Sequence, residues 1–480
     1  MTVNKKTSKP MHFFECQGEH FLVNVESQDF YEIHPAVFHL LGHDADVADA
    51  IRDGLYEEYG EVIVALAMDE VSRLTERNAP LPLLFTGEDI VACYTAAPIT
   101  TVNLLVSYKC NLACSYCYSK ELRNRAEGTL LMRLEVAFRA VDLFLESSLR
   151  HGFPKVTFKF SGGGEPLMNF DLIRQLIEYV QRHELSAQVD VQFKLSTNGI
   201  LLSKEIIDFF KDKPIEVKIS IDGCEDIHGR QRSNHKERGT YKKLIENIKC
   251  ALETLSPDRV VAAVTILDPE QLSDTLVYLI DMGFQRIRTQ KAIVPQSSTL
   301  RRREWRVSAP KNVFLQYYEI LKKYKREGVN ADSWPSLESI DMFIEGLNRQ
   351  ENKRYMACNA GIYDCAVDPD GNIYSCNRFA GDPSQKMGDV FRGIEAEWRE
   401  DFCRATNLCN RSKCLDCWLI YWCGGNCNYL NQIETGDMLN PRAESCDTMK
   451  DFFEHVIWFY CKLRRENPGM LEHLVSRKVF

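Results

Sequence analysis

Three cysteines, Cys110, Cys114 and Cys117, are spaced C-x3-C-x2-C and follow the apolar segment 102–107. Structural zinc sites are almost always four-coordinate, so three thiolates do not complete one. Three thiolates can bind three irons of a [4Fe-4S] cluster and leave the fourth iron open for a substrate or cofactor. The spacing therefore predicts an iron–sulfur centre that takes part in chemistry.

A second cysteine group extends from Cys358 to Cys446 and includes C-x2-C-x5-C-x3-C spacing. The two groups hold twelve of the eighteen cysteines. Grouped cysteines in a reducing compartment are more often metal ligands than disulfide partners. We therefore expect two separate metal-binding regions. The remaining cysteines are typical of small buried side chains: Cys16, Cys93, Cys224, Cys250, Cys403 and Cys461.

The composition is that of an ordinary globular protein of 480 residues, with 45% hydrophobic and 26% charged residues. A net charge of −9 argues against binding nucleic acid through bulk positive charge. The first residues lack the apolar core of a secretory signal, and no segment approaches the ~18 apolar residues of a membrane span. We therefore expect a cytoplasmic chain with no nucleic-acid and no membrane partner.

Between about 100 and 300, apolar β-branched segments alternate with amphipathic ones. The predicted strands are 102–107, 155–160, 189–196, 215–221, 259–266 and 285–290, and predicted helices include 134–145, 203–211, 239–255 and 270–282. This α/β pattern predicts a parallel sheet with outer helices, its strands buried on both faces, closed or partly open as a barrel. Chemistry in such a barrel lies at the carboxyl ends of the strands, where the first cysteine group is expected.

The flanking segments suggest further parts. Residues 11–33 predict short strands and 35–74 predict helices, as in a compact binding module or, alternatively, a structural extension. The basic segment 301–306 predicts a solvated face or a contact with an acidic part of a peptide. We expect a recognition module at 1–85, a linker at 86–99, the barrel at 100–300, a bridging helical region at 301–350, a cysteine-rich domain at 351–450 and a C-terminal helix at 451–480.

The first cysteine group, with Tyr116 before its last cysteine and a six-unit β-α domain around it, resembles the radical S-adenosylmethionine (SAM) superfamily. The resemblance implies a partial (β/α)6 TIM-like barrel. It also implies that SAM binds at a [4Fe-4S] cluster held by Cys110, Cys114 and Cys117.

Three other segments resemble motifs of that superfamily: Gly163-Gly164-Glu165-Pro166, Ser196-Thr197-Asn198-Gly199 and Ser220-Ile221-Asp222-Gly223. The resemblance implies that Glu165 engages the methionine amine of SAM, and that Ser220 and Arg232 contact its carboxylate and ribose. Tyr116, Gly163, Gly164, Ser196 and Asn198 complete the implied cofactor contacts. In the superfamily, the usual sequence after the fourth strand is Ile-His-Asp. This chain has Gly229 in place of the aspartate.

The second cysteine group resembles the SPASM domain of radical SAM enzymes that modify peptides, with structural zinc as the alternative. The resemblance implies two auxiliary [4Fe-4S] clusters, and therefore three clusters in the chain. Cys358, Cys376 and Cys427 would bind the first, and Cys414, Cys417, Cys423 and Cys446 the second. Cys365 is either a fourth ligand of the first cluster or leaves it with an open iron, and Cys409 is either a spare thiol or an exchanged ligand.

Segment 374–394 and the N-terminal module resemble maturases that form thioether links, with a winged-helix-like element that recognises the peptide. The chain resembles those acting on the six-cysteine SCIFF peptides and on the small subunit of quinohemoprotein amine dehydrogenase, and its N-terminal length and Gly162-Gly163-Gly164-Glu165-Pro166 favour the second. The resemblance implies a cysteine-containing peptide or small protein as substrate, and an electron donor such as flavodoxin or ferredoxin. The sequence identifies no catalytic base.

Three alternatives remain at this stage. The chain could oxidise a Cys or Ser of a sulfatase to formylglycine, or couple two carbons of a peptide. It could also be a zinc-stabilised peptide-binding chaperone with no turnover.

Overall fold

The structure is a computed structural model that describes residues 11–41, 48–76, 86–120, 122, 129–232, 240–292, 308–349 and 353–477. The basic segment 301–306 lies outside these residues. The chain divides into two compact units, each built from separate segments. Unit 1 is Met1–Gly87, Ile340–Ala357 and Thr406–Phe480, and unit 2 is Glu88–Ser339 and Cys358–Ala405.

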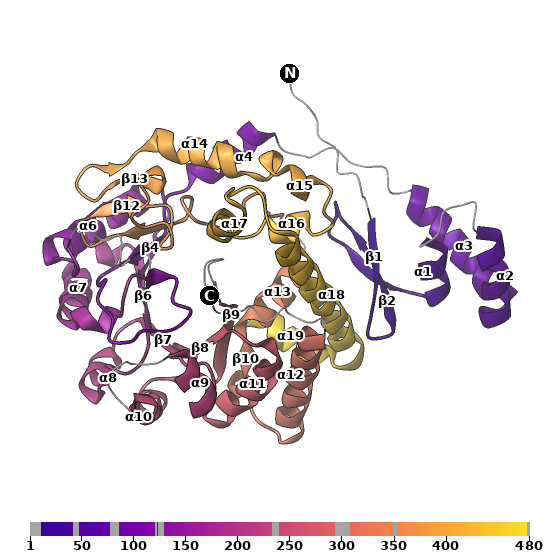
Figure 1. Cartoon of the computed structure of the whole chain (residues 1–480), viewed down its shortest axis with the longest axis horizontal. Helices are drawn as coiled ribbons and strands as arrows, with labels where there is room; N and C mark the ends of the chain where they lie inside the picture. The colour runs from indigo at the N-terminus through magenta and orange to yellow at the C-terminus, as the bar shows by residue number, and fades with distance from the viewer. Residues whose placement is uncertain are drawn as a thin grey trace. The chain divides into compact units, whose positions relative to one another are not determined.

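Unit 2 contains six parallel strands that pair in the order of the sequence (Figure 1). They are β4 (Thr101–Leu104), β5 (Lys155–Phe160), β6 (Asp190–Thr197), β7 (Ile215–Ser220), β8 (Val260–Ile266) and β9 (Arg286–Lys291). Each predicted strand is confirmed, with ends that differ by a few residues. The fold is that of a partial α/β barrel.

One face of several strands is more open than the sequence predicted. In β7 the side chains of Val217 and Ile219 are buried, whereas Glu216, Lys218 and Ser220 stay partly exposed. The expectation that the strands are buried on both faces is therefore wrong for β7 and for β5 and β6, which show a similar alternation. Successive side chains of a strand point to opposite faces, so the charged residues share the face turned away from the helices.

Helices follow the strands and cover the other face of the sheet (Figure 1). They are α6 (Leu134–Arg150), α7 (Phe170–Arg182), α8 (Lys204–Phe210), α9 (Glu225–Gln231), α10 (Thr240–Thr254) and α11 (Leu272–Asp281). In α7 the buried residues are spaced three and four apart, as one face of a helix requires. The predicted helices at 134–145, 203–211, 239–255 and 270–282 are confirmed.

The sheet continues beyond the six strands on both sides, which the sequence did not predict. The added strands are β10 (Ser336–Leu337), β11 (Asp364–Val367), β12 (Asn372–Tyr374), β13 (Lys386–Asp389) and β14 (Gly393–Ile394). β10 pairs with β9 and β11 pairs with β4, both in parallel, and β12 to β14 follow as antiparallel neighbours. The added strands and the six parallel strands form one open sheet that ends at β10 and β14.

Helices α4 (Gly87–Ala96), α12 (Ser308–Arg326) and α14 (Ala396–Thr406) join this framework, and α4 lies within the predicted linker. Arg399 of α14 donates hydrogen bonds to the carbonyls of Thr95 at 3.2 Å and Ile362 at 2.7 Å. A guanidinium provides several donors in one plane, so Arg399 joins the end of α4 to the segment before β11.

Unit 1 begins with an antiparallel sheet of β1 (Met11–Cys16), β2 (Glu19–Asn24) and β3 (Phe30–Ile33). Its helices are α1 (Pro35–Leu41), α2 (Ala48–Tyr59), α3 (Glu61–Glu76), α13 (Glu338–Arg349), α15 (Ser412–Leu415), α16 (Ile420–Cys423), α17 (Asn428–Thr435), α18 (Ala443–Glu466) and α19 (Pro468–Ser476). These confirm the strands predicted at 11–33 and the helices predicted at 35–74.

Alternate residues of β1 contact different parts of unit 1. Phe13 meets Phe38 of α1 edge-on, with ring centroids 5.9 Å apart. His12 stacks on Trp418 at 4.2 Å with the two rings nearly parallel. The period-2 alternation of a strand thus places α1 on one face of the sheet and the Cys417–Cys423 segment on the other.

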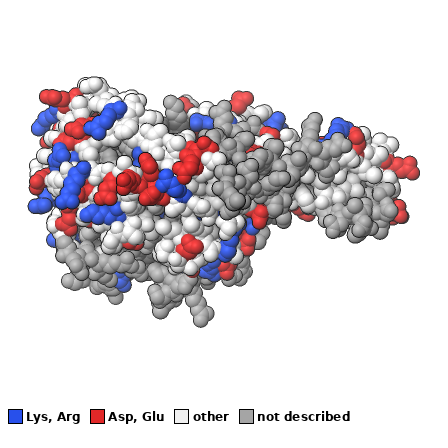
Figure 2. All heavy atoms as spheres, turned by 90° about the horizontal axis from the view of Figure 1, so that it is seen from above, with Lys and Arg blue, Asp and Glu red and all other residues white. Residues whose placement is uncertain are grey.

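The described helices include none with both the length and the apolar character that crossing a lipid bilayer would require. On the face drawn in Figure 2, acidic and basic side chains are interspersed.

Candidate active site

The first cysteine group lies in the loop after β4, at the carboxyl end of that strand. Cys110, Cys114 and Cys117 are all partly exposed. Burial raises the pKa of the Cys114 thiol to about 11; Arg232 acts in the opposite direction, and the Cys117 and Cys110 thiolates add to the increase. The backbone N–H of Cys117 donates to the Cys114 carbonyl at 3.3 Å, so the loop turns between these two cysteines.

Three thiolates suit an iron–sulfur cluster, in which each can bind a different iron. Among the described residues, no three His, Cys, Asp or Glu side chains surround one position closely enough for a lone metal ion. In a [4Fe-4S] cluster the thiolates bind different irons, so their sulfurs stand further apart. Metal binding also supplies the free energy that deprotonates a buried thiol.

The glycine-rich motif packs directly on the start of the cysteine loop. The backbone N–H of Gly164 donates to the carbonyl of Ser107 at 2.7 Å, and that of Glu165 donates to Lys109 at 2.8 Å. A Cβ at Gly164 would lie 2.1 Å from the Lys109 carbonyl oxygen, so only glycine fits. The motif therefore fixes where the cysteine loop begins.

Glu165 connects that motif to the end of β6. Its carboxylate is 3% exposed and accepts hydrogen bonds from Thr197 Oγ1 at 2.6 Å and from the Asn198 N–H at 2.8 Å. Burial raises the pKa of Glu165, and these hydrogen bonds oppose the increase. An ionised carboxylate has about four acceptor positions, so further capacity remains for an ammonium group.

Asn198 in turn reaches back to the cysteine loop. Its side-chain amide donates to Asn111 Oδ1 at 2.7 Å. The sequence analysis did not single out Asn111, although it directly follows Cys110. This bond brings the β6 motif and the cysteine loop together at one edge of the sheet.

Asp222 is the centre of a second set of contacts at the end of β7. It receives two hydrogen bonds from Arg232, at 2.7 and 3.0 Å, and one from Tyr116 Oη at 2.7 Å. The Arg232 guanidinium also lies 5.4 Å from the centre of the Tyr116 ring. Burial acts to raise the pKa of Asp222, but Arg232 and the hydrogen bonds hold it below the usual value. Asp222 thus joins Tyr116 and Arg232, two of the predicted cofactor contacts, although it was not itself predicted as one.

His228 completes this corner as a neutral group. Its Nδ1 accepts the Asp222 backbone N–H at 3.3 Å. Burial, with the nearby Arg232 charge, lowers the pKa of His228 to about 4. The next residue, Gly229, is exposed, and a Cβ added there would meet nothing within 4 Å.

Ser196 and Ser220, the remaining predicted contacts, lie on the open face of β6 and β7 and are partly exposed. Ser196 is paired across the sheet with Lys218. The structure therefore brings all four sequence motifs to the carboxyl edge of β4 to β7.

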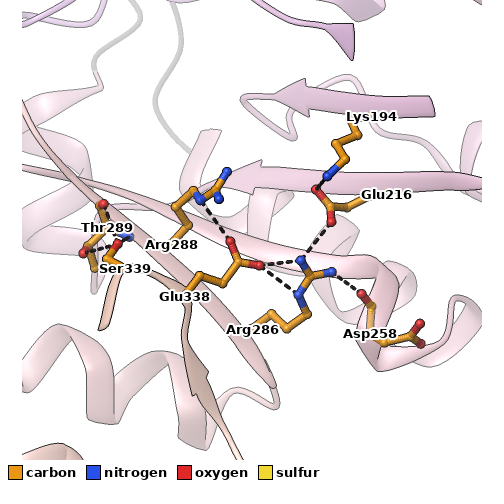
Figure 3. A network of polar contacts seen from close by, with 8 residues as sticks. All are labelled: Lys194, Glu216, Asp258, Arg286, Arg288, Thr289, Glu338 and Ser339. Atoms are coloured by element: carbon orange, nitrogen blue, oxygen red, sulfur yellow. Dashed lines mark hydrogen bonds and ion pairs between the residues drawn. The ribbon is translucent and has the colours of Figure 1, made fainter. Parts of the chain in front are cut away.

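Below this edge, the open face of the sheet carries a row of charges that the sequence analysis missed (Figure 3). Glu216 lies 3.8 Å from Lys194 and 2.9 Å from Arg286. Glu338, 2% exposed, pairs with Arg286 and with Arg288, the latter at 2.9 Å. The lysines and arginines at alternate positions of these strands could have predicted this charged row.

Lys218 is the unusual member of this row. It makes no hydrogen bond or close ion pair with any other described residue. Burial, together with the positive charge of Arg288, lowers its pKa to about 8, and Glu216 and Glu338 oppose the decrease. TIM-type barrels usually fill this region with branched apolar side chains, whereas this sheet carries charged ones.

Comparison with known proteins identifies the domain that these motifs build. The pattern of the Radical SAM superfamily matches residues 104–281. This chain carries a radical SAM domain.

Relatives extend the similarity beyond the radical SAM domain. The cysteine-type anaerobic sulfatase-maturating enzyme of Clostridium novyi (strain NT) is 21% identical over 360 residues, which cover 73% of this chain and 93% of that protein. The structure of anSMEcpe with bound AdoMet covers 79% of this chain and 98% of that chain, with 17% identity and a TM-score of 0.64. Streptococcus suis SuiB bound to precursor peptide SuiA covers 92% and 99%, with 15% identity and a TM-score of 0.51.

A radical SAM domain uses one [4Fe-4S] cluster and SAM. In this chain Cys110, Cys114 and Cys117 supply the thiolates that fit such a cluster. Glu165, Asn198, Asp222 and Arg232 surround the same edge of the sheet.

Four cysteines of the second group line one cavity of about 150 Å³ within unit 1: Cys414, Cys417, Cys423 and Cys446. They come from α15, the loop after it, α16 and the first turns of α18. Burial raises the pKa of Cys414 to about 12, and Cys423 adds to the increase. These are the four residues predicted for the second auxiliary cluster.

The other cysteines of this group have different surroundings. Cys365 lies in β11 and is fully buried, on the face opposite the Asp364 side chain that contacts Lys159 at 3.8 Å. Burial raises the pKa of Cys365 far above the usual value, with Asp364 adding and Arg399 opposing. Cys358 and Cys376 belong to unit 2, and Cys409 and Cys427 belong to unit 1.

Proposed function

We propose that this chain is a radical SAM maturase that forms thioether cross-links between cysteine sulfurs and carbons of a peptide or small protein. The convergence of Cys110, Cys114 and Cys117 with the Glu165 and Asp222 networks supports the radical SAM chemistry. Relatives that mature sulfatases, and SuiB bound to its precursor peptide, support a polypeptide substrate. The similarity to thioether-forming enzymes in segment 374–394 supports the bond type.

When bound, the cluster and SAM supply one-electron chemistry that generates a 5′-deoxyadenosyl radical. The residues of this chain have supporting roles. Glu165 holds acceptor oxygens at the edge of the sheet, where they can bind an ammonium group of SAM. Asp222 fixes Arg232 and Tyr116 beside the cysteine loop. The charged face below them accommodates a polar segment of the substrate.

The cysteines of the SPASM-like region are proposed to hold two auxiliary clusters. Cys414, Cys417, Cys423 and Cys446 would bind one, and Cys358, Cys376 and Cys427 the other. Cys365, buried in β11, is either a fourth ligand of that cluster or a thiol whose absence from the cluster leaves one iron open. An electron donor such as a flavodoxin or ferredoxin would supply the electron that reductive SAM cleavage needs, and the electron released on forming the link would leave through the auxiliary clusters.

Formylglycine formation is the second candidate, because a curated relative is a sulfatase-maturating enzyme. The two reactions leave different products. A thioether link removes two hydrogens and one free thiol but keeps the sulfur, whereas conversion of cysteine to formylglycine removes the sulfur. Mass spectrometry of small cysteine-containing proteins co-expressed with the enzyme separates them, as it does carbon–carbon coupling, which keeps the free thiol.

Cys114→Ala tests the radical SAM assignment directly. We expect loss of SAM cleavage, measured as 5′-deoxyadenosine, because the cluster then lacks one of three thiolates. Cys250→Ala on α10 is the matched control and should retain it. Iron and sulfide analysis after anaerobic purification completes the test, since zinc without sulfide would support the binding-protein alternative.

A further inference from the structure

A buried arginine stands at the centre of the segments that line the second auxiliary cavity. Arg411 is 0% exposed, and its backbone carbonyl accepts the N–H of Cys414 at 2.8 Å. Its guanidinium donates to the carbonyls of Gly425 at 3.2 Å and Met438 at 3.1 Å. It also donates to Thr406 O at 3.1 Å and to Asn428 Oδ1.

These acceptors belong to the segments that carry the cysteines. Gly425 lies between Cys423 and Cys427, and Met438 lies in the turn that leads to α18 and Cys446. A Cβ at Gly425 would lie 2.4 Å from Arg411 Cδ, and its φ of +101° is one that L side chains rarely adopt. The close contact between this backbone and the arginine therefore requires glycine.

A neutral side chain shares two of these acceptors. Asn431, also 0% exposed, donates to Gly425 O at 3.0 Å and to Met438 O at 2.9 Å. Arg411 and Asn431 thus hold the same two loops, but only Arg411 adds a charge. This pair allows the effect of the charge to be separated from that of the hydrogen bonds.

The charge has a physical consequence for a cluster in this cavity. Iron–sulfur potentials depend on net charge and on hydrogen bonding around the cluster. Reduction adds an electron, and a fixed positive charge in a low-dielectric interior stabilises the more negative state. The Arg411 guanidinium donates to the carbonyl of Gly425 at 3.2 Å, and Gly425 lines the cavity, so the charge lies one hydrogen bond from the cavity wall.

We infer that Arg411 is a positioning residue for the second auxiliary centre and that its charge raises the reduction potential of the cluster bound there. This inference rests on the proposed function, which places a [4Fe-4S] cluster on Cys414, Cys417, Cys423 and Cys446.

The test uses the full chain in a Cys114→Ala, Cys376→Ala background, in which only this cluster is expected. Iron content and the reduced-to-oxidised ratio are measured in an anaerobic redox titration followed by electron paramagnetic resonance. In Arg411→Gln, the ratio at the parent midpoint should fall about tenfold, which is ~59 mV for a one-electron couple. Arg411→Lys and Asn431→Ala should each stay within about twofold of the parent.

An unchanged ratio in Arg411→Gln, or an equal fall in Asn431→Ala, would overturn the inference. If Arg411→Gln fails to bind iron, the iron loading and the reduced-to-oxidised ratio of Arg411→Lys test the inference instead. Restored loading with the parent ratio supports the role of the charge, whereas failed loading or a ratio lowered tenfold contradicts it. A parent protein with far fewer than roughly four irons per chain would instead contradict the proposed auxiliary cluster.

Discussion

Asp222 shows how a single carboxylate organises the candidate active site. It accepts from Arg232 and Tyr116, and also from the Thr265 backbone N–H at 2.9 Å. These donors come from the cysteine loop, the segment after α9, and β8. A sequence motif that ends a strand can locate such a residue, but its partners are distant in the chain, and only the fold reveals them.

Replacing Asp222 by asparagine should be costly. A buried guanidinium that loses its carboxylate partner is destabilised by about 3–5 kcal/mol. We expect a decrease of this size in the free energy of unfolding, measured by urea titration, together with loss of SAM cleavage. Asp226→Asn, exposed on α9, is the control and should change stability by less than about 0.5 kcal/mol. Equal effects of the two substitutions would show that the Asp222–Arg232 pair is not important.

At the scale of elements, the spacing of apolar residues predicted the strands and helices that depend on neighbouring residues in the sequence. Segment 155–160 coincides with β5, because β-branched and aromatic residues at 156, 158 and 160 alternate with more polar ones. The pairing of β11 with β4 was not predicted, since it joins residues far apart in sequence, such as Asn103 and Cys365. A strand as short as β11, in a turn-rich segment, has too few residues for its side-chain alternation to be recognised.

The open face of the sheet was misjudged for a different reason. Parallel strands are usually covered on both sides, and that general rule was given more weight than the residues themselves. Lys194, Lys218 and Arg288 alternate with buried apolar neighbours, which indicates a strand with one solvated face.

The contact between the glycine motif and the cysteine loop predicts different outcomes for two alanine substitutions. Gly164→Ala should displace the Lys109 carbonyl and with it the cysteine loop, at a cost of about 1–3 kcal/mol. We expect iron loading of the first cluster and deoxyadenosine formation to fall at least tenfold. Gly229→Ala has nothing within 4 Å of the added Cβ and should retain both. If Gly164→Ala loads iron normally, the motif does not position the loop.

The charged row predicts how stability depends on pH. The pKa of Lys218 is lowered from 10.5 to about 8, so the unfolded chain binds more protons between these values. The free energy of unfolding contributed by this residue should therefore rise with pH across that window. Lys218→Met should abolish the rise and stabilise the protein at pH 7 by up to about 3 kcal/mol. Urea titrations from pH 7 to 10.5 measure this; Lys155→Met, exposed at the start of β5, is the control and should behave as wild type.

At the scale of the molecule, the two units are built from interleaved segments of chain. Residues 340–357 and 406–480 complete unit 1 together with the N-terminal segment. The sequence pattern correctly predicted the strands and helices of that segment, but not which later residues pack on them. Trp418 is an example, because a tryptophan between two cysteines gives no local indication that it stacks on His12.

Trp418 therefore allows a test of whether the N-terminal sheet is held by the cysteine-rich segment. Its ring lies 4.2 Å from His12 and 6.4 Å from Phe14, and nearby Tyr421 donates to Glu26 at 2.9 Å. Trp418→Ala removes both ring contacts and leaves a cavity that costs about 3–5 kcal/mol. We expect backbone amides of residues 11–24 to exchange hydrogen at least tenfold faster, as measured by mass spectrometry.

The matched control is Trp398→Ala in unit 2, where the ring stacks on Phe402 at 4.9 Å. It removes a similar aromatic contact and should leave exchange in residues 11–24 unchanged. Wild-type exchange in Trp418→Ala would mean that α1 and the hydrogen bonds of the sheet are sufficient to hold it. Faster exchange would mean that the proposed recognition module and the Cys417–Cys423 segment form one cooperative structure. A peptide that binds this sheet would then be energetically coupled to residues beside the second auxiliary centre.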